Sequence, residues 1–421
     1  MARAAGGTPR AAGGTAPARA ETAESLGCSK APDDAGLTSG PGPRCDAART
    51  GDGAAPRRDS VEGLVGLVTG GVLSVGSRGP GAALTSGPDS LGAEAPVVLA
   101  VDSGGSGMRV VLAVGGRVVG GPVVSKEPVR TGVRGIDAGH LLAQLLPVAR
   151  GLVEDAGVGA LAAVAVGAAG FATLGERMRA ELPSALGREL GVRRVALVAD
   201  AVSAYTGALG PSPGVVIAAG TGLIAIGTDL ERWRRADGWG HLLGDCGGGA
   251  WIGRAGLEAA LRAHDGRPGG SARLLTRAEE LFGPVAGLPG RLYPRPDRPA
   301  VLASFAPEVA EAAAQAGDDP VAADILRAAA RHMADSAAAV CPASGEPRIA
   351  LTGGLFKLGD PLLVPLEAEL AERLPYARRV PAEGDPLAGS VRIATDLAVG
   401  GLRLPYDEQM LYVVAEKQHP K

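Results

Sequence analysis

Short apolar runs and longer amphipathic segments alternate along the chain from Val97 onward. The runs VVLAVDS and MRVVLAV are rich in β-branched residues and flank a Gly/Ser turn, which predicts a hairpin with at least one buried strand. An apolar face in LLAQLLPVA predicts a helix over 138–156, and LAAVAVGAAG and RRVALVAD indicate two buried strands with a helix between them. This alternation favours an α/β unit with a partly parallel sheet.

The same order of patterns begins again at Gly214. GVVIAAGTG and LIAIGTD predict a second strand, turn and strand, and helices are expected over about 251–339, interrupted by a Pro/Gly-rich loop near 283–299. RIALTGG predicts one more strand, which is followed by helices over 361–373 and near 387–399. The repetition suggests two related lobes.

We therefore expect an α/β fold with an N-terminal lobe at 95–208 and a C-terminal lobe at 209–386. The last helix, 387–399, is a candidate to pack back on the N-terminal lobe. Residues 1–94 contain no Ile, Phe, Tyr or Trp and repeat RAAGGT and LTSGP, so they are expected to be a disordered low-complexity extension. Two other interpretations of this extension stay open: a regulatory or partner-binding arm, and a gene start assigned too far upstream.

Composition and charge exclude several classes of function. A net charge of −3 with scattered Lys and Arg gives no basic surface for nucleic acid. The apolar stretch at 61–75 is shorter than the roughly 20 residues of a membrane span, so no membrane partner is expected. The four cysteines show no CxxC or Cys/His spacing, which argues against disulfides or zinc and favours a cytoplasmic protein.

The first chemical motif is VDSGGSGMR at 101–109. A strand that ends in an acid and runs into a Gly-rich turn can offer backbone N–H groups to phosphate oxygens, while Asp102 holds Mg²⁺ through water. The simpler alternative is an ordinary hairpin turn.

The second motif centres on Asp200, between the buried strand of ALVAD and a helix of small residues. A carboxylate fixed at a strand's end can accept a proton from a substrate hydroxyl. The alternative is that Asp200 only caps its helix.

Three more Gly-rich motifs follow strands. Gly220, Thr221 and Gly222 predict another phosphate-facing turn, and Gly353 and Gly354 allow backbone to approach a nucleotide closely. The stretch DGWGHLLGDCGGGAWIGR is the most specific, because Gly-rich backbone can wrap a small polar ligand and Asp245 can accept a pair of sugar hydroxyls. His241 in the same stretch is a ligand candidate or a histidine satisfied by backbone.

These five motifs, in this order, resemble the N-acetylglucosamine kinase and bacterial glucosamine kinase branch of the sugar kinase, heat-shock chaperone and actin superfamily, over about 97–399. The resemblance implies two ribonuclease-H-like lobes, ATP and Mg²⁺ bound between them, and transfer of the γ-phosphoryl group to the 6-hydroxyl of an amino sugar.

The resemblance also implies roles for individual residues. It makes Asp200 the general base, Asp102 the residue that holds Mg²⁺ through water, and Asp137 a sugar-facing residue where the family usually has Asn. The residues that it implies for binding the ATP phosphates are Gly104, Gly105, Ser106, Gly220, Thr221 and Gly222. Those for adenosine are Gly353 and Gly354. Those for the sugar are Asp137, Gly240, His241 and Asp245.

Three positions depart from the family pattern: Gly107 replaces a usual Lys or Arg, Leu223 a usual Ser, and Cys246 a usual Glu. Arg109 is a candidate to replace the missing phosphate contact. Asp137 leaves the choice between glucosamine and N-acetylglucosamine open.

Two alternatives to a kinase remain on this fold. One is an ATPase activator of radical dehydratases, whose iron–sulfur cysteine pattern Cys246 and Cys341 do not match. The other is a non-catalytic sugar or nucleotide sensor. The expected partners are a small amino sugar and ATP, and a homodimer is considered.

Overall fold

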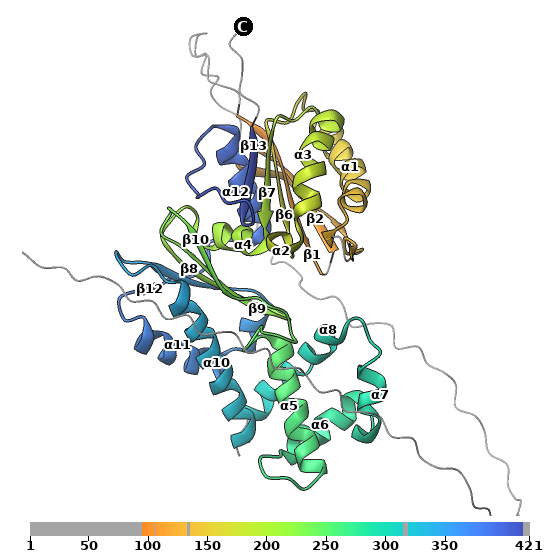
Figure 1. Ribbon diagram of the computed structural model, residues 1–421, viewed down its shortest axis with the longest axis vertical. Coiled ribbons are helices and arrows are strands. Elements are labelled where there is room, and N and C mark those ends of the chain that lie inside the picture. The colour runs from red at the N-terminus through yellow and green to blue at the C-terminus, as the bar shows by residue number, and fades with distance from the viewer. Residues whose placement is uncertain (1–94, 106, 133–134, 315–318, 416–421) are drawn as a thin grey trace, which may run out of the picture. The chain divides into compact units, whose positions relative to one another are not determined.

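The computed structural model describes residues 95–105, 107–132, 135–314 and 319–415. Within them the strands form two larger sheets and one small hairpin (Figure 1). The expectation of a disordered extension at 1–94 lies outside the described residues, as does the expected phosphate ligand Ser106.

The first sheet has the order β13-β7-β6-β1-β2-β3. The strands β1, β2 and β3 are antiparallel neighbours, whereas β6 and β7 run parallel to β1, and β13 closes the far edge antiparallel to β7. In chain order its strands are β1 (Val97–Gly104), β2 (Gly107–Val114), β3 (Arg117–Ser125), β6 (Ala163–Ala168), β7 (Arg194–Ala199) and β13 (Leu411–Ala415).

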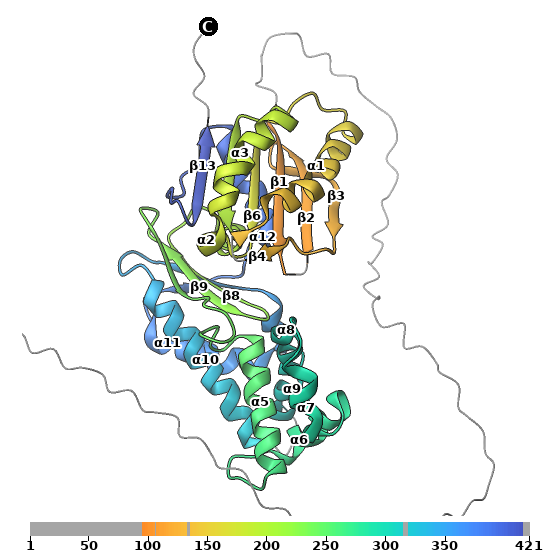
Figure 2. The ribbon, with the colours of Figure 1, turned by 45° about the vertical axis from the view of Figure 1, so that its right-hand side comes forward.

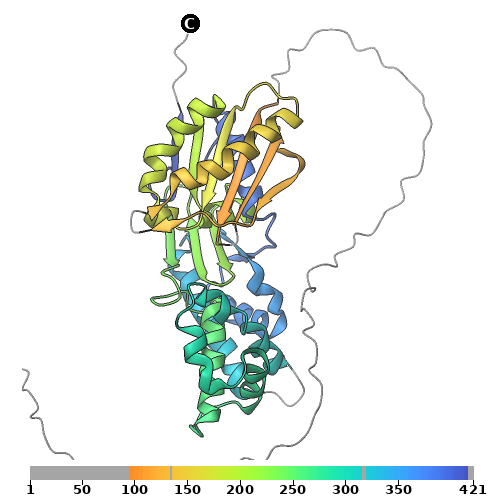
Figure 3. The ribbon, with the colours of Figure 1, turned by 90° about the vertical axis from the view of Figure 1, so that its right-hand side faces the viewer.

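Helices cover both faces of the first sheet. Figures 1 and 3 show α1 and α3 over one face, while α12 and α4 lie against the other, where α12 contacts β1 and β6. Because β6 (AVAVGA) is buried at every position, it reads as a continuous apolar run, as central parallel strands do. The remaining elements of this part are β4 (Thr131–Gly132), β5 (Gly135–Ile136), α1 (Ala138–Asp155), α2 (Phe171–Leu174), α3 (Glu176–Leu190), α4 (Asp200–Leu209) and α12 (Pro386–Ala398).

The second sheet repeats the pattern of the first, with the order β10-β9-β8-β11-β12. Again three antiparallel strands are followed by parallel ones, so the two related units expected from the sequence are present. Its strands are β8 (Gly214–Ala219), β9 (Leu223–Thr228), β10 (Trp233–Asp237), β11 (Arg348–Thr352) and β12 (Arg378–Arg379).

The second sheet is buried on both faces. Val216, Ile226 and Ala350 pack into the core of the first sheet and α4, whereas Val215 and Ile349 pack into a second core with α5 and α10 (Figure 2). The helical elements here are α5 (Gly249–His264), α6 (Ala272–Phe282), η1 (Val285–Gly287), α7 (Leu288–Leu292), α8 (Arg298–Ala303), α9 (Ala306–Ala314), α10 (Pro320–Val340), η2 (Gly354–Leu358) and α11 (Asp360–Arg373).

One expectation about these elements was wrong, and six strands were missed. The segment near 283–299 is not a plain loop, because η1, α7 and the start of α8 lie in it; Pro289 and Pro299 fall in the first turns of α7 and α8, where proline is tolerated. The strands that were not expected from the sequence are β3, β4, β5, β10, β12 and β13. All six lie at sheet edges, where burial does not impose an apolar run.

No helix within the described ranges is both long enough and apolar enough to cross a bilayer.

Two helices that frame the site approach each other through glycine. A side-chain carbon on Gly389 of α12 would collide with Ser203 and Gly207 of α4, and one on Gly207 would collide with the backbone of Asp385. The backbones of α4 and α12 are therefore in direct contact, and this contact fixes where both helices begin.

We predict that Gly389→Ala destabilises the protein by about 1–3 kcal/mol, because the added methyl must push α4 and α12 apart. The matched control is Gly151→Ala in α1, where a Cβ meets nothing within 4 Å. That change should stabilise by up to about 1 kcal/mol through helix propensity. Urea unfolding of both variants is the measurement, and equal stability of the two would contradict the close contact.

Candidate functional site

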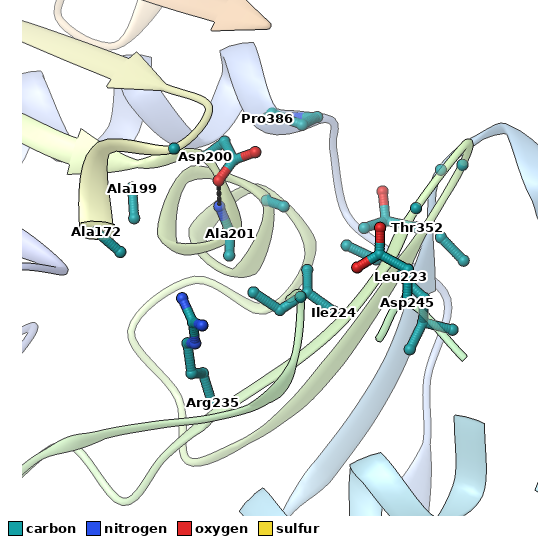
Figure 4. A pocket seen from close by; sticks show the side chains of 18 of the residues that line it. Ala172, Ala199, Asp200, Ala201, Leu223, Ile224, Arg235, Asp245, Thr352 and Pro386 are labelled. Atoms are coloured by element: carbon teal, nitrogen blue, oxygen red, sulfur yellow. Dashed lines mark hydrogen bonds between the residues drawn. The ribbon is translucent and has the colours of Figure 1, made fainter. Parts of the chain in front are cut away.

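A cavity of about 510 Å³ lies between the two sheets, lined by residues of both. Its walls come from the loop after β6, the first turn of α4, the β8–β9 hairpin, the inner face of β10 and the ends of β11 and α12 (Figure 4). The polar side chains that line it are Arg109, Thr173, Asp200, Arg235, Asp245, Thr352 and Asp385.

Asp200 is the first residue of α4, directly after β7. Ala199 is the N-cap, and the Asp200 carboxylate accepts one hydrogen bond, 2.9 Å long, from the N–H of Ala201. The side chain meets solvent at the cavity, yet protein on the other sides desolvates it and raises its pKa to about 6, with the nearby charge of Asp102 adding to the rise. Such a carboxylate is poised to take up a proton near neutral pH.

Arg109 on β2 joins two carboxylates from distant parts of the chain. Its Nε and Nη2 donate to Oδ2 of Asp102 at 3.1 and 2.6 Å, and its Nη1 donates to Oδ2 of Asp385 at 2.6 Å. Burial raises the pKa of Asp385, but the hydrogen bond from Ala388 N–H and the Arg109 guanidinium outweigh this and lower it below its ordinary value. Arg109, the candidate phosphate contact, thus reaches the cavity with its charge shared between two acids.

The first turn of α5 holds the turn Gly220–Thr221–Gly222 in place. The carbonyls of Gly220 and Thr221 accept from the N–H groups of Gly249 and Ala250, at 2.9 and 2.8 Å, and so satisfy the first turn of α5. Gly220 and Gly222 both line the cavity. The carboxylate of Asp245 occupies the space that a Cβ at position 222 would need, so this approach requires glycine.

Asp245 is held in a tight loop beside this turn. Its Oδ1 accepts from Gly240 N–H at 3.0 Å, and its own N–H donates to Asp237 Oδ1 at 2.6 Å. Both aspartates adopt a positive φ, 54° for Asp245 and 60° for Asp237, which is uncommon for residues other than glycine. Burial raises the pKa of Asp245 above its ordinary value. Its other oxygen, Oδ2, lies against Gly222 at the cavity wall.

The cavity thus collects five of the predicted site residues. They come from opposite sheets: Asp200 from the first, and Gly220, Gly222, Asp245 and Gly353 from the second or the loops that follow its strands.

Other predicted site residues lie elsewhere. Gly104 and Gly105 line a separate cavity of about 140 Å³ with the segment 128–131, and His241 lines a third, of about 360 Å³, against α5 and α7. Thr221, Gly240 and Gly354 are not among the lining residues of the main cavity, although Thr221 and Gly240 make the backbone bonds described above. Asp102 reaches the cavity wall only through Arg109.

Asp137 is the N-cap of α1. Its Oδ1 accepts from His140 N–H at 3.1 Å, and this bond is the main reason that the pKa of Asp137 is lowered. It does not line the main cavity. This geometry is the one that a helix cap requires.

The sequence analysis missed several polar residues of the cavity region, among them Thr173 and Thr352. Asp385 carried a signal, since Asp-Pro before an apolar run marks a helix start, but nothing linked it to Arg109. Arg235 and Asp237 lie on β10, the edge strand that was not expected, so no pattern could assign them to the cavity side.

The donor chemistry of the site suits a hard cation that retains water and phosphate ligands. Asp102 and Asp200 are near enough for the charge of one to raise the pKa of the other, and Arg109 contacts Oδ2 of Asp102. Within the ranges that the structure describes, no three His, Cys, Asp or Glu side chains converge to form a metal site. One carboxylate such as Asp102 is sufficient for Mg²⁺, which usually binds one or two together with phosphates and water.

The chain resembles proteins of known structure and name. A protein from Chromobacterium violaceum named as a candidate N-acetylglucosamine kinase is 25% identical with a TM-score of 0.51, covering 70% of this chain and 98% of its own. One from Porphyromonas gingivalis with the same type of name is 18% identical with a TM-score of 0.52, covering 71% and 98%, and supports the fold alone.

A curated relative is the N-acetylmuramic acid/N-acetylglucosamine kinase of Clostridium acetobutylicum, 39% identical over 82 residues. The match covers 19% of this chain and spans only 27% of that relative's length.

A family model gives the broadest match. It covers residues 99–389, which include both sheets except the first two residues of β1 and the whole of β13. Every polar residue that lines the main cavity falls within this range. With two sheets of the same strand order and the cavity between them, the chain has the fold of actin-like ATPases and sugar kinases and belongs to the BadF/BadG/BcrA/BcrD ATPase family.

Proposed function

We propose that the protein is an ATP-dependent amino-sugar kinase that transfers the γ-phosphoryl group to the 6-hydroxyl of N-acetylglucosamine or glucosamine. The observation that carries this proposal is the position of Asp200, with a pKa of about 6, across one cavity from the glycine turns Gly220–Gly222 and Gly353. The hydroxyl acceptor requires a base that takes its proton, and the polyphosphate donor requires backbone N–H groups that approach its oxygens closely. The names of the similar kinases support the same chemistry.

The reaction needs little covalent chemistry from the protein. The acceptor oxygen forms a bond to the γ-phosphorus, the bond from that phosphorus to the oxygen of the β-phosphate breaks, and ADP leaves. Asp200 takes the proton of the acceptor hydroxyl. Gly220, Gly222 and Gly353 let the phosphates and nucleoside lie against backbone, and Asp245 accepts hydrogen bonds from sugar hydroxyls.

Magnesium is the expected cofactor for ATP in this role. Asp102 would hold it through water, and when bound it would neutralise phosphate charge. Arg109 is a further cation at the cavity wall, and its ion pairs with Asp102 and Asp385 partly neutralise its charge.

A coupled ADP-release assay with glucosamine, N-acetylglucosamine, glucose and N-acetylmannosamine tests the proposal directly. We expect ADP release that depends on an amino sugar. Tight sugar binding without sugar-dependent ADP release would instead indicate a sensor, and ADP release that no sugar changes would contradict the kinase assignment.

Asp200→Asn should lower kcat by about 10²- to 10⁴-fold, because the amide cannot accept the acceptor's proton. ATP affinity should stay nearly unchanged, since the base contacts the acceptor and not the nucleotide. The control is Asp324→Asn on the exposed side of α10, which should leave kcat as it is. A Asp200→Asn variant that retains more than about a third of wild-type kcat would remove Asp200 from this role.

The pH profile of kcat/KM should fall on the acid side of about pH 6, by about tenfold per unit. The sign follows from the raised pKa: below it Asp200 is protonated and cannot act as a base, and above it the carboxylate is available. Asp102 on β1 raises this pKa and Arg235 on β10 opposes the rise. A profile that stays flat to about pH 4.5, measured where circular dichroism reports a folded protein, would exclude the raised pKa.

A further inference from the structure

Arg235 is a cation at the wall of the main cavity that the mechanism above does not use. It lies in the middle of β10, where it pairs with Ile226 of β9, and its side chain lines the cavity. Among the described residues it forms no ion pair, and its buried Nη2 has no hydrogen-bond partner. Because buried donors are nearly always paired, a buried guanidinium in this state requires an explanation.

The guanidinium is held in place by an aromatic ring. The Arg235 Cζ lies 4.3 Å from the centre of the Trp239 ring, within the range of a cation–π contact. Trp239 is itself 62% exposed, so this contact orients the arginine without burying the ring in a core. The positive charge is therefore fixed at one position on the wall.

The charges around this part of the cavity are unevenly distributed. Figure 4 shows Arg235 on the same side as Ala172, Ala199 and Ala201, with Asp200 beyond them, whereas Asp245 and Thr352 lie on the other side. Asp385 and Asp102 are both occupied by Arg109. Asp200 is thus a carboxylate on the Arg235 side of the cavity, and the charge of Arg235 acts on it.

A guanidinium and three alanine methyl groups that line the same cavity suit an N-acyl group. An acyl carbonyl oxygen accepts hydrogen bonds from a guanidinium, and an acyl methyl group packs against alanine side chains. A free amine is protonated near neutral pH, and its positive charge would face the fixed charge of Arg235 in a partly desolvated space.

We propose that Arg235, together with Ala172, Ala199 and Ala201 of the same cavity, forms the subsite for the 2-substituent of the acceptor. Arg235 then makes the enzyme select N-acylated over free amino sugars. This inference rests on the proposed kinase function and names the substrate class within it. Arg235 is then a specificity residue, which favours a carbonyl oxygen and excludes an ammonium group.

The test compares kcat/KM for N-acetylglucosamine and glucosamine in the wild type and in Arg235→Gln, Arg235→Lys and Arg234→Gln. The wild type should prefer N-acetylglucosamine by about tenfold or more, the range expected for one charged hydrogen bond. Arg235→Gln should reduce this ratio by about tenfold, mostly by admitting glucosamine, whereas Arg235→Lys keeps the charge and should keep most of the exclusion. Arg234 is the exposed neighbour on the same strand, and its substitution should leave the ratio unchanged.

Calorimetric binding of each sugar without ATP gives a second readout if Arg235→Gln lowers kcat itself. The same change in the ratio of affinities would support the proposal. A wild-type preference for glucosamine, a ratio that Arg235→Gln leaves within about twofold, or an equal effect of Arg234→Gln would overturn it. Failure of the kinase proposal is distinct: the wild type would then release no ADP in response to either sugar.

Discussion

The direct contact between the backbones of α4 and α12 is the constraint on which the site depends. It requires glycine at 207 and 389, and it sets the starting points of both helices. Asp200 begins α4 and Asp385 caps α12, so the contact brings together two carboxylates that are far apart in sequence. Arg109 then ties Asp385 to Asp102 on β1. The wall of the cavity formed by Asp200, Asp385 and Arg109 is therefore held in place by the packing of α4 against α12.

The opposite wall of the cavity is held mainly by backbone hydrogen bonds. There the β8–β9 turn, the start of α5 and the loop around Asp245 are held by backbone hydrogen bonds and by two aspartates with positive φ. Backbone N–H and C=O groups do not change charge with pH, whereas Asp200 does. The cavity thus has the proton acceptor Asp200 on the side of the first sheet, and backbone dipoles together with the Asp245 carboxylate on the side of the second. This arrangement suits a proton acceptor that faces a polyphosphate.

The sequence predicted the central strands and the long helices, because buried runs such as AVAVGA and VALVA leave a clear apolar signal. It also predicted the repeated order of strands that forms the two sheets, and five of the predicted site residues line one cavity, while their roles stay predictions. It could not predict β10, whose exposed and half-buried residues follow no simple pattern, and so Arg235 went unnoticed. For Asp137 the resemblance suggested a sugar contact; the structure shows that its carboxylate caps α1, and the sugar contact stays a prediction.

The strand β13 gives the molecule an order of assembly during synthesis. Leu411 pairs with Val198 at the edge of the first sheet, and α12, which covers the same sheet, ends only at Ala398. All strands of the second sheet lie between Gly214 and Arg379, and so they are synthesised before β13. Domains usually fold from the N-terminus as they emerge. All strands of the second sheet are therefore synthesised before the first sheet receives its last strand. Until β13 is made, β7 is an edge strand of the first sheet.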